Sequence, residues 1–224
     1  MSRSSAPPLD KNDLRKLLVL IAASAVDMIG FAIVLPLLPF YAENLDATPK
    51  TIGWIIASFS IAQLISAPLW GRVSDRYGRR PALLIGLSAS AVAYVAFGLA
   101  NTVAWLFLSR IIQGAGGGTT GVAQAYVADS IPAAGRARAL GWLSAATSLG
   151  VMIGPVVGSL AAHWGRAAPG FVAAGLCLAN VIFAWRFLPE SRRVGEHAPT
   201  RKPVWHAAWQ VFRSPGTTVA RLVW

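Results

Sequence analysis

Residues 71–80 read Gly71-Arg72-Val73-Ser74-Asp75-Arg76-Tyr77-Gly78-Arg79-Arg80, which places four arginines between two long apolar runs. The flanking segments 60–70 and 81–99 contain no charged side chain. Apolar runs of this kind cross a bilayer, whereas arginines gather in short loops on the cytoplasmic side of a membrane. The stretch therefore predicts a cytoplasmic turn between two membrane spans.

The composition agrees with a polytopic membrane protein. Hydrophobic residues make up 55% of the chain and charged residues only 13%, and the mean hydropathy is +0.54. Soluble domains are markedly more charged. The formal charge of +11 could indicate nucleic-acid binding, but the basic residues are distributed between apolar segments instead of forming one face. We therefore expect no nucleic-acid partner.

The single cysteine, Cys177, lies inside an apolar run. One cysteine excludes an internal disulfide framework, and no metal-binding pattern accompanies it. The sequence accordingly predicts no metal site and no cofactor. The few polar residues inside the spans include no nucleophile and base that can be placed together, so we also predict no catalytic residues and no enzyme.

Six apolar segments are long enough to cross a bilayer, which takes roughly 20 residues. They cover about residues 17–40, 52–70, 82–100, 103–127, 139–161 and 168–188. The fold class predicted is thus an all-α polytopic membrane protein. We expect residues 1–16 to be a cytoplasmic N-terminus, 17–188 a six-helix transmembrane domain, and 189–224 a cytoplasmic linker leading towards a second half that is missing.

The orientation follows from the distribution of lysine and arginine. Most basic residues fall on one side of the predicted spans: Arg3, Lys11, Arg15, Lys16, Arg72, Arg76, Arg79, Arg80, Arg136, Arg138, Arg192, Arg193, Arg201 and Lys202. The other side carries Lys50 and Arg166. Both ends of the segment are therefore predicted to be cytoplasmic, in a multi-pass protein of the plasma membrane, which in bacteria is the inner membrane.

The chain also contains an internal repeat. Ile52-Gly53-Trp54 at the start of the second span recurs as Leu140-Gly141-Trp142 at the start of the fifth, an offset of about 88 residues. Three spans separate the copies, so the two units face opposite ways across the membrane. This predicts two inverted three-helix repeats, as in secondary transporters.

Two ionisable side chains lie within the spans. Asp27 in the first span has Ser24 and Gly30 on the same helical face, where small neighbours leave room for water or a ligand. Burial pushes a carboxylate towards its neutral form. Asp27 is therefore a candidate for proton coupling or substrate binding.

Arg110 lies early in the fourth span. Steps of three and four residues from it select a polar and glycine-rich face, namely Gln113, Gly114, Gly117, Gly121 and Gln124. Such a face lines a cavity or lets another backbone approach closely. Because a guanidinium keeps its proton, we expect Arg110 to tune or pair with a carboxylate, with Gln113 beside it. A structural ion pair or a snorkelling arginine is the alternative.

The fifth span contains Gly150, Gly154 and Gly158, spaced four apart, with Pro155 among them. The glycines form a smooth helical face, and the proline removes one backbone hydrogen bond. Both close helix packing and a bend that changes between states are compatible with this pattern.

At these motifs the chain resembles the major facilitator superfamily, and within it the drug:proton antiporters of the tetracycline-efflux branch. The stretch from Gly71 to Arg80 is similar to the superfamily loop G-x-L-x-D-R-x-G-R-R, with Val73 in place of leucine. Arg110 to Gly114 is similar to the fourth-helix motif R-x-x-Q-G. Gly150 to Ser159 is similar to the antiporter motif G-x-x-x-G-P-x-x-G-G, with Ser159 at the last position.

The resemblance covers residues 15–193 and implies the N-terminal half of a twelve-helix transporter. It implies a cytoplasmic gate made of Gly71, Asp75, Arg76, Gly78, Arg79 and Arg80. It further implies proton coupling through Arg110, coupling or substrate recognition by Asp27, and an antiporter motif of Gly150, Gly154, Pro155 and Gly158.

The function expected from these observations is proton-coupled efflux of a small amphiphilic or cationic drug-like molecule by alternating access. The expected partners are this substrate, protons, the lipid bilayer, and either the missing C-terminal half or a second copy. Two alternatives remain open on the sequence: an uptake symporter for a sugar or organic acid, and a non-transporting membrane fragment.

Overall fold

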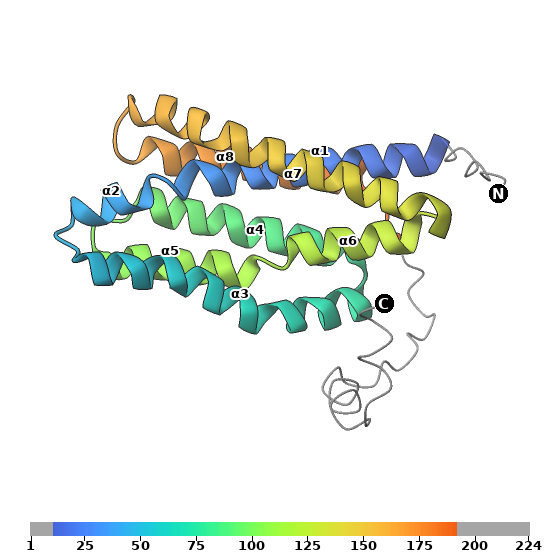
Figure 1. Cartoon of the computed structure of the whole chain (residues 1–224), viewed down its shortest axis with the longest axis horizontal. Helices are drawn as coiled ribbons and strands as arrows, with labels where there is room; N and C mark the ends of the chain where they lie inside the picture. Colours follow the sequence, from blue (N-terminus) through green and yellow to red (C-terminus); the bar gives the residue numbers. More distant parts are fainter. Residues whose placement is uncertain (1–10, 192–224) are drawn as a thin grey trace, which may run out of the picture. The chain divides into compact units, whose positions relative to one another are not determined.

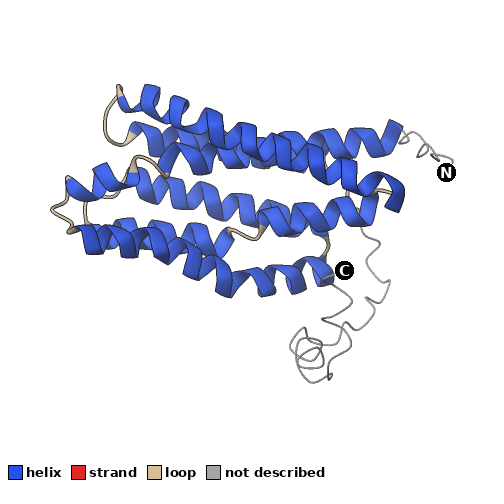
Figure 2. Cartoon of the chain, in the orientation of Figure 1, coloured by secondary structure: helices blue, strands red, loops and turns tan. Residues whose placement is uncertain are grey.

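The computed structural model describes residues 11–191, and within that range all regular structure is helical (Figure 2). The helices are α1 (Lys11–Val34), α2 (Leu38–Glu43), α3 (Pro49–Tyr77), α4 (Arg79–Gly98), α5 (Val103–Gly116), α6 (Thr119–Ser130), α7 (Ala133–Ala162) and α8 (Ala168–Phe187). The all-α prediction and the six spans are confirmed. Residues 1–10 and 192–224, which include most of the predicted linker 189–224, lie outside the described residues.

Two of the six spans consist of two helices each. The first span changes from α1 to α2 around Pro36, which has no N–H with which to continue the helix. The fourth changes from α5 to α6 within Gly116–Gly118, and glycine has low helix propensity. Five segments of the described chain are long and apolar enough to cross a membrane unaided, because the fourth span is divided into two shorter helices.

The turn predicted over residues 71–80 is present but far shorter than a loop. Helix α3 continues to Tyr77 and α4 starts at Arg79, so Gly78 alone connects them. An ion pair of 2.7 Å between Asp75 and Arg79, four residues apart, spans this turn. Gly78 has a φ of 103°, which a residue with a Cβ rarely adopts, so the reversal depends on glycine.

The helices pack in a pattern with internal symmetry. Helix α1, from the first span, packs along α7, from the fifth, and α5, from the fourth, packs along α3, from the second (Figure 1). Helix α4 packs against α5 in the way that α8 packs against α1, and α4 and α8 contact each other. This exchange of partners is what two inverted three-helix repeats require.

The interior is filled around α4, whose Tyr94 and Phe97 are fully buried. In contrast, α3 and α7 expose many large apolar side chains, among them Leu64, Ile65 and Val156. Apolar surface of this extent is suited to lipid or to a second helical layer and not to water. We call the end of the bundle that carries the Gly78 turn the basic end.

Candidate functional site

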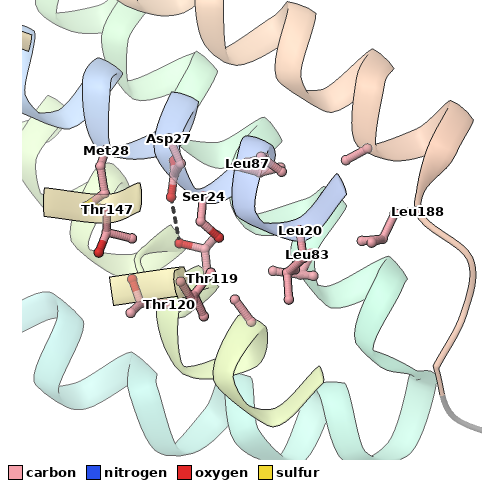
Figure 3. A pocket seen from close by; sticks show the side chains of 14 residues that line it. Leu20, Ser24, Asp27, Met28, Leu83, Leu87, Thr119, Thr120, Thr147 and Leu188 are labelled. Atoms are coloured by element: carbon pink, nitrogen blue, oxygen red, sulfur yellow. Dashed lines mark hydrogen bonds between the residues drawn. The ribbon is translucent and has the colours of Figure 1, made fainter. Parts of the chain in front are cut away.

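Asp27 lies in a pocket between helices of both repeats (Figure 3). The residue is only 7% exposed. The pocket is lined by residues of α1, α4, α6, α7 and α8, including Ser24, Leu87 and Thr147. The space open to the centre of a water molecule is about 20 Å³, which is enough for a water molecule. Ser24 shares the pocket with Asp27 as predicted, whereas Gly30 packs against the ring of Tyr94.

The partner of Asp27 is Thr119, which the sequence analysis did not single out. The Thr119 hydroxyl donates a hydrogen bond of 2.9 Å to Oδ2 of Asp27, and Figure 3 shows the two side chains meeting. Thr119 is the first residue of α6, directly after the Gly116–Gly118 break. The signal available in the sequence was a threonine that follows three glycines inside an apolar span.

Arg110 and Gln113 lie together on α5 but outside the Asp27 pocket. Arg110 is 1% exposed, and its guanidinium lies 5.5 Å from the centroid of the Phe97 ring. None of its three side-chain nitrogens has a hydrogen-bond partner among the described residues, and no described carboxylate forms an ion pair with it. Gln113 donates a hydrogen bond of 2.8 Å to the Tyr94 hydroxyl. The expected carboxylate partner of Arg110 is therefore absent from the described part of this conformation.

The polar and glycine-rich face predicted for the fourth span lets the backbone of α3 approach closely in its first half but does not continue past the break between α5 and α6. Gly114 packs so closely on α3 that an added Cβ would lie 2.3 Å from the Phe59 carbonyl oxygen. Gly121 and Gln124, on α6, are instead exposed. The helical periodicity behind the prediction does not continue across the break between α5 and α6.

Arg79 is the centre of a polar cluster at the basic end. Its side chain is 9% exposed and donates to Ser74 at 2.6 Å and to Asp129 at 2.8 Å, in addition to its ion pair with Asp75. Asp75 and Arg79 of the predicted gate thus meet directly. Asp129, at the end of α6, is a partner that the motif did not indicate. The cluster links α3, α4 and α6.

Glu190, in the segment after α8, also contacts the Gly78 turn at the basic end. Its two carboxylate oxygens accept hydrogen bonds from the backbone N–H groups of Arg79, at 2.9 Å, and Arg80, at 3.1 Å. These N–H groups belong to the first turn of α4, which has no partner of its own within the helix. The Arg80 side chain donates to the Trp185 carbonyl on α8. The segment after α8 is therefore fastened to the Gly78 turn.

The remaining motif residues at this end are more exposed. A Cβ added at Gly71 would have no neighbour within 4 Å. The guanidinium carbon of Arg76 lies 5.5 Å from the centroid of the Tyr77 ring. Both are on the exposed part of α3. They are available to contact something outside the described residues.

The glycine motif of α7 packs on α1. A Cβ added at Gly150, Gly154 or Gly158 would lie 2.4–2.8 Å from backbone or Cβ atoms of α1. The closest of these approaches is that of Gly154 to Ala32. Helix α7 continues through Pro155 to Ala162, and Pro155 is exposed. The close-packing interpretation of the glycines is therefore the one that fits this conformation.

Comparison with known proteins agrees with this architecture. The family model described as Major Facilitator Superfamily matches residues 20–224. The chain belongs to the major facilitator superfamily. It is therefore a multi-pass membrane protein, as the apolar spans had suggested.

Its relatives and structural neighbours fall in the same group. It is 32% identical to Multidrug resistance protein 2 of Bacillus subtilis over 80% of this chain and 45% of that protein. It is 33% identical to the class C Tetracycline resistance protein of Escherichia coli, over 82% of this chain and 47% of that protein. The crystal structure of the human organic anion transporter MFSD10 (TETRAN) superimposes with a TM-score of 0.73 and 27% identity, over 85% of this chain and 51% of that one.

A structure of the peptide transporter POT has the same fold, with a TM-score of 0.71 at 17% identity. The chain spans about half the length of the curated relatives it matches.

Proposed function

We propose that this chain is the N-terminal half of a proton-coupled efflux transporter for small, amphiphilic or cationic drug-like molecules. The transporter works by alternating access in the bacterial inner membrane, and both ends of segment 1–224 are cytoplasmic. The names of the relatives, multidrug and tetracycline resistance proteins, support efflux of drug-like molecules over the uptake of a sugar or organic acid. The other half comes from the same chain or from a second copy.

The observation that carries the proposal is the placement of Asp27. It is a nearly buried carboxyl group in a pocket with room for water, at the junction of helices from both repeats. Intramembrane carboxyls that face a cavity and not lipid are the groups that proton-driven transporters use. The ionised form holds a cationic or polar substrate, and protonation weakens that hold and favours the inward-open state.

Arg110, Gln113 and the Arg79 cluster have supporting roles in this mechanism. The proposed role of Arg110 is to pair with a carboxyl group in another conformation of the transport cycle, because its guanidinium has no hydrogen-bond partner among the described residues in this one. The cluster of Arg79 with Asp75 and Asp129, which joins α3, α4 and α6, is in this proposal part of the cytoplasmic gate, and its separation opens the cytoplasmic side. The exposed Gly71 and Arg76 face the other half of the gate.

The test uses the complete transporter in everted membrane vesicles. Asp27→Asn removes the titratable proton at nearly constant volume, so proton release on adding drug and drug accumulation under a proton gradient are both expected to be lost. Asp46→Asn is the matched control, because Asp46 is exposed and has a φ of 57°, which asparagine also tolerates. Retention of proton-coupled efflux by Asp27→Asn would refute the proposal. Accumulation of the substrate when the proton gradient has the opposite direction would identify a symporter.

A further inference from the structure

The break between α5 and α6 leaves backbone carbonyl groups without their usual i+4 helical partners in the middle of a membrane span, and Gly114 accepts an i+3 bond from the Gly117 N–H at 3.0 Å instead. In a bilayer such groups must find donors within the protein. Helix α3 provides them: Ser66 donates to the Gly114 carbonyl at 3.1 Å, Trp70 to Ala115 at 2.6 Å, and Gln63 to Gly117 at 3.0 Å. The break is therefore hydrogen-bonded to α3 at three points.

The two sides of the break are also in close steric contact. An added Cβ on Gly118 would lie 2.3 Å from the indole ring of Trp70 on α3. On the α4 side, an added Cβ on Gly86 would lie 2.7 Å from the Thr119 methyl group. The break thus has little freedom to move without moving α3 or α4.

The residue that follows the break contacts Asp27. Thr119 donates its hydroxyl hydrogen to the Asp27 carboxyl group, whereas no residue of α3 lines the pocket around Asp27. A hydrogen-bonded connection from Asp27 to α3 runs through Thr119 and the glycine break. Helix α3 also carries Ser74 and Asp75, two partners of Arg79 at the basic end.

We propose that the Gly116–Gly118 break is a joint that couples the Asp27 carboxyl group to α3, with Thr119 as the positioning residue. A change in the hydrogen bond to Asp27 displaces the first turn of α6, and the three donors on α3 follow the displaced carbonyl groups. The relevance of this joint to transport rests on the proposed function. The coupling of Asp27 to α3 can be tested by itself, without a transport measurement.

The test is infrared difference spectroscopy of the whole chain in lipid between acid and alkaline pH. The Asp27 carboxyl band is identified by its loss in Asp27→Asn. Thr119→Val keeps the side-chain shape without the hydroxyl, so the Asp27 band is expected to shift, and Thr119→Ser is expected to restore it. A merely structural role of Thr119 would not give a shift that serine reverses.

The decisive variant is Gln63→Leu, which removes the hydrogen bond from α3 to the Gly117 carbonyl. Its control is Ser58→Ala on the same helix, because in the described part of the chain the Ser58 hydroxyl donates to the Ile55 carbonyl of α3 and does not reach the break. We expect Gln63→Leu to shift the Asp27 band in a way that Ser58→Ala does not. Ser66→Ala is a second, smaller change at the same joint if Gln63→Leu does not fold. Identical spectra for the joint variants and Ser58→Ala would overturn the proposal.

Amide hydrogen exchange gives a second readout that is independent of the titration of Asp27. Thr119→Val is expected to raise exchange in residues 63–70 of α3 as well as in 114–119, whereas Ser58→Ala leaves the 114–119 segment unchanged. Unchanged exchange in 63–70 would mean that the break does not transmit the change and would overturn the proposal. Failure of the proposed function appears elsewhere, as efflux that survives Asp27→Asn.

Discussion

The contact between α7 and α1 gives a sharp prediction because two glycines of α7 have opposite surroundings. A Cβ added at Gly154 would lie 2.4 Å from the Ala32 Cβ, about 1 Å short of the 3.4 Å at which ordinary contact begins. The other close atoms belong to the α1 backbone, including the Ile29 carbonyl oxygen at 2.9 Å. In contrast, Gly141 has nothing within 4 Å. Alanine at position 154 must therefore displace a helix, whereas alanine at 141 displaces nothing.

The magnitude follows from two effects. Replacing glycine by alanine within a helix stabilises it by about 1 kcal/mol at either position, so this effect cancels between the two variants. Forcing an extra methyl group into a filled interface costs about 1–3 kcal/mol. For a chain of this size 1 kcal/mol corresponds to about 2–4 °C in Tm, so Gly154→Ala should melt about 2–12 °C below Gly141→Ala.

The assay is thermal unfolding of both variants purified in the same detergent, with the unsubstituted chain alongside. Gly141→Ala is expected to equal or exceed the parent, and Gly154→Ala to fall below Gly141→Ala. Equal melting of the two variants would refute the close approach of α7 to α1. It would return the glycine motif to the alternative role of a bend that changes between states.

Three further predictions concern the basic end and use the same thermal assay. Glu190→Gln should lower the free energy of unfolding by about 1.5–3 kcal/mol, since it removes the charged carboxylate that accepts hydrogen bonds from the first N–H groups of α4. An unchanged Tm would show that this cap is not formed. Asp129→Asn should cost about 1–3 kcal/mol, because the nearly buried Arg79 loses one of its two carboxylate partners; a neutral effect would exclude that pair. Gly78→Ala should cost at least about 1–2 kcal/mol from its positive φ alone, and a stabilised variant would contradict the turn geometry.

The parts of the fold that depend on hydrophobicity could be predicted from the sequence. Each span is a long apolar run, and the arginines around residues 72–80 mark the turn between two of them. Helix ends were less predictable, because α3 continues past the apolar run through Arg72 and Asp75, where charged side chains are compatible with a helix that projects from the membrane. The division of the fourth span was missed because three glycines have the same hydropathy whether the helix continues or breaks.

The candidate site was predictable only in part, for a related reason. Asp27 is conspicuous because a carboxyl group in an apolar run is expensive. Its partner Thr119 is not, since threonine is common in spans and only the three-dimensional packing brings position 119 to position 27. Asp129 and Glu190 were likewise missed as partners of the Gly78 turn, because both lie far from it in the sequence.

The symmetric pairing of the helices also has a consequence for biosynthesis. Helix α1 is the first to leave the ribosome, yet its main partners, α7 and α8, are the last two of the described bundle to be made. Until they arrive, the pocket around Asp27 has only part of its walls. Contacts between segments so distant in the chain form slowly and late, so the nascent first span must be held in place by the insertion machinery or by lipid. Assembly of this bundle is therefore expected to be completed by its final hairpin.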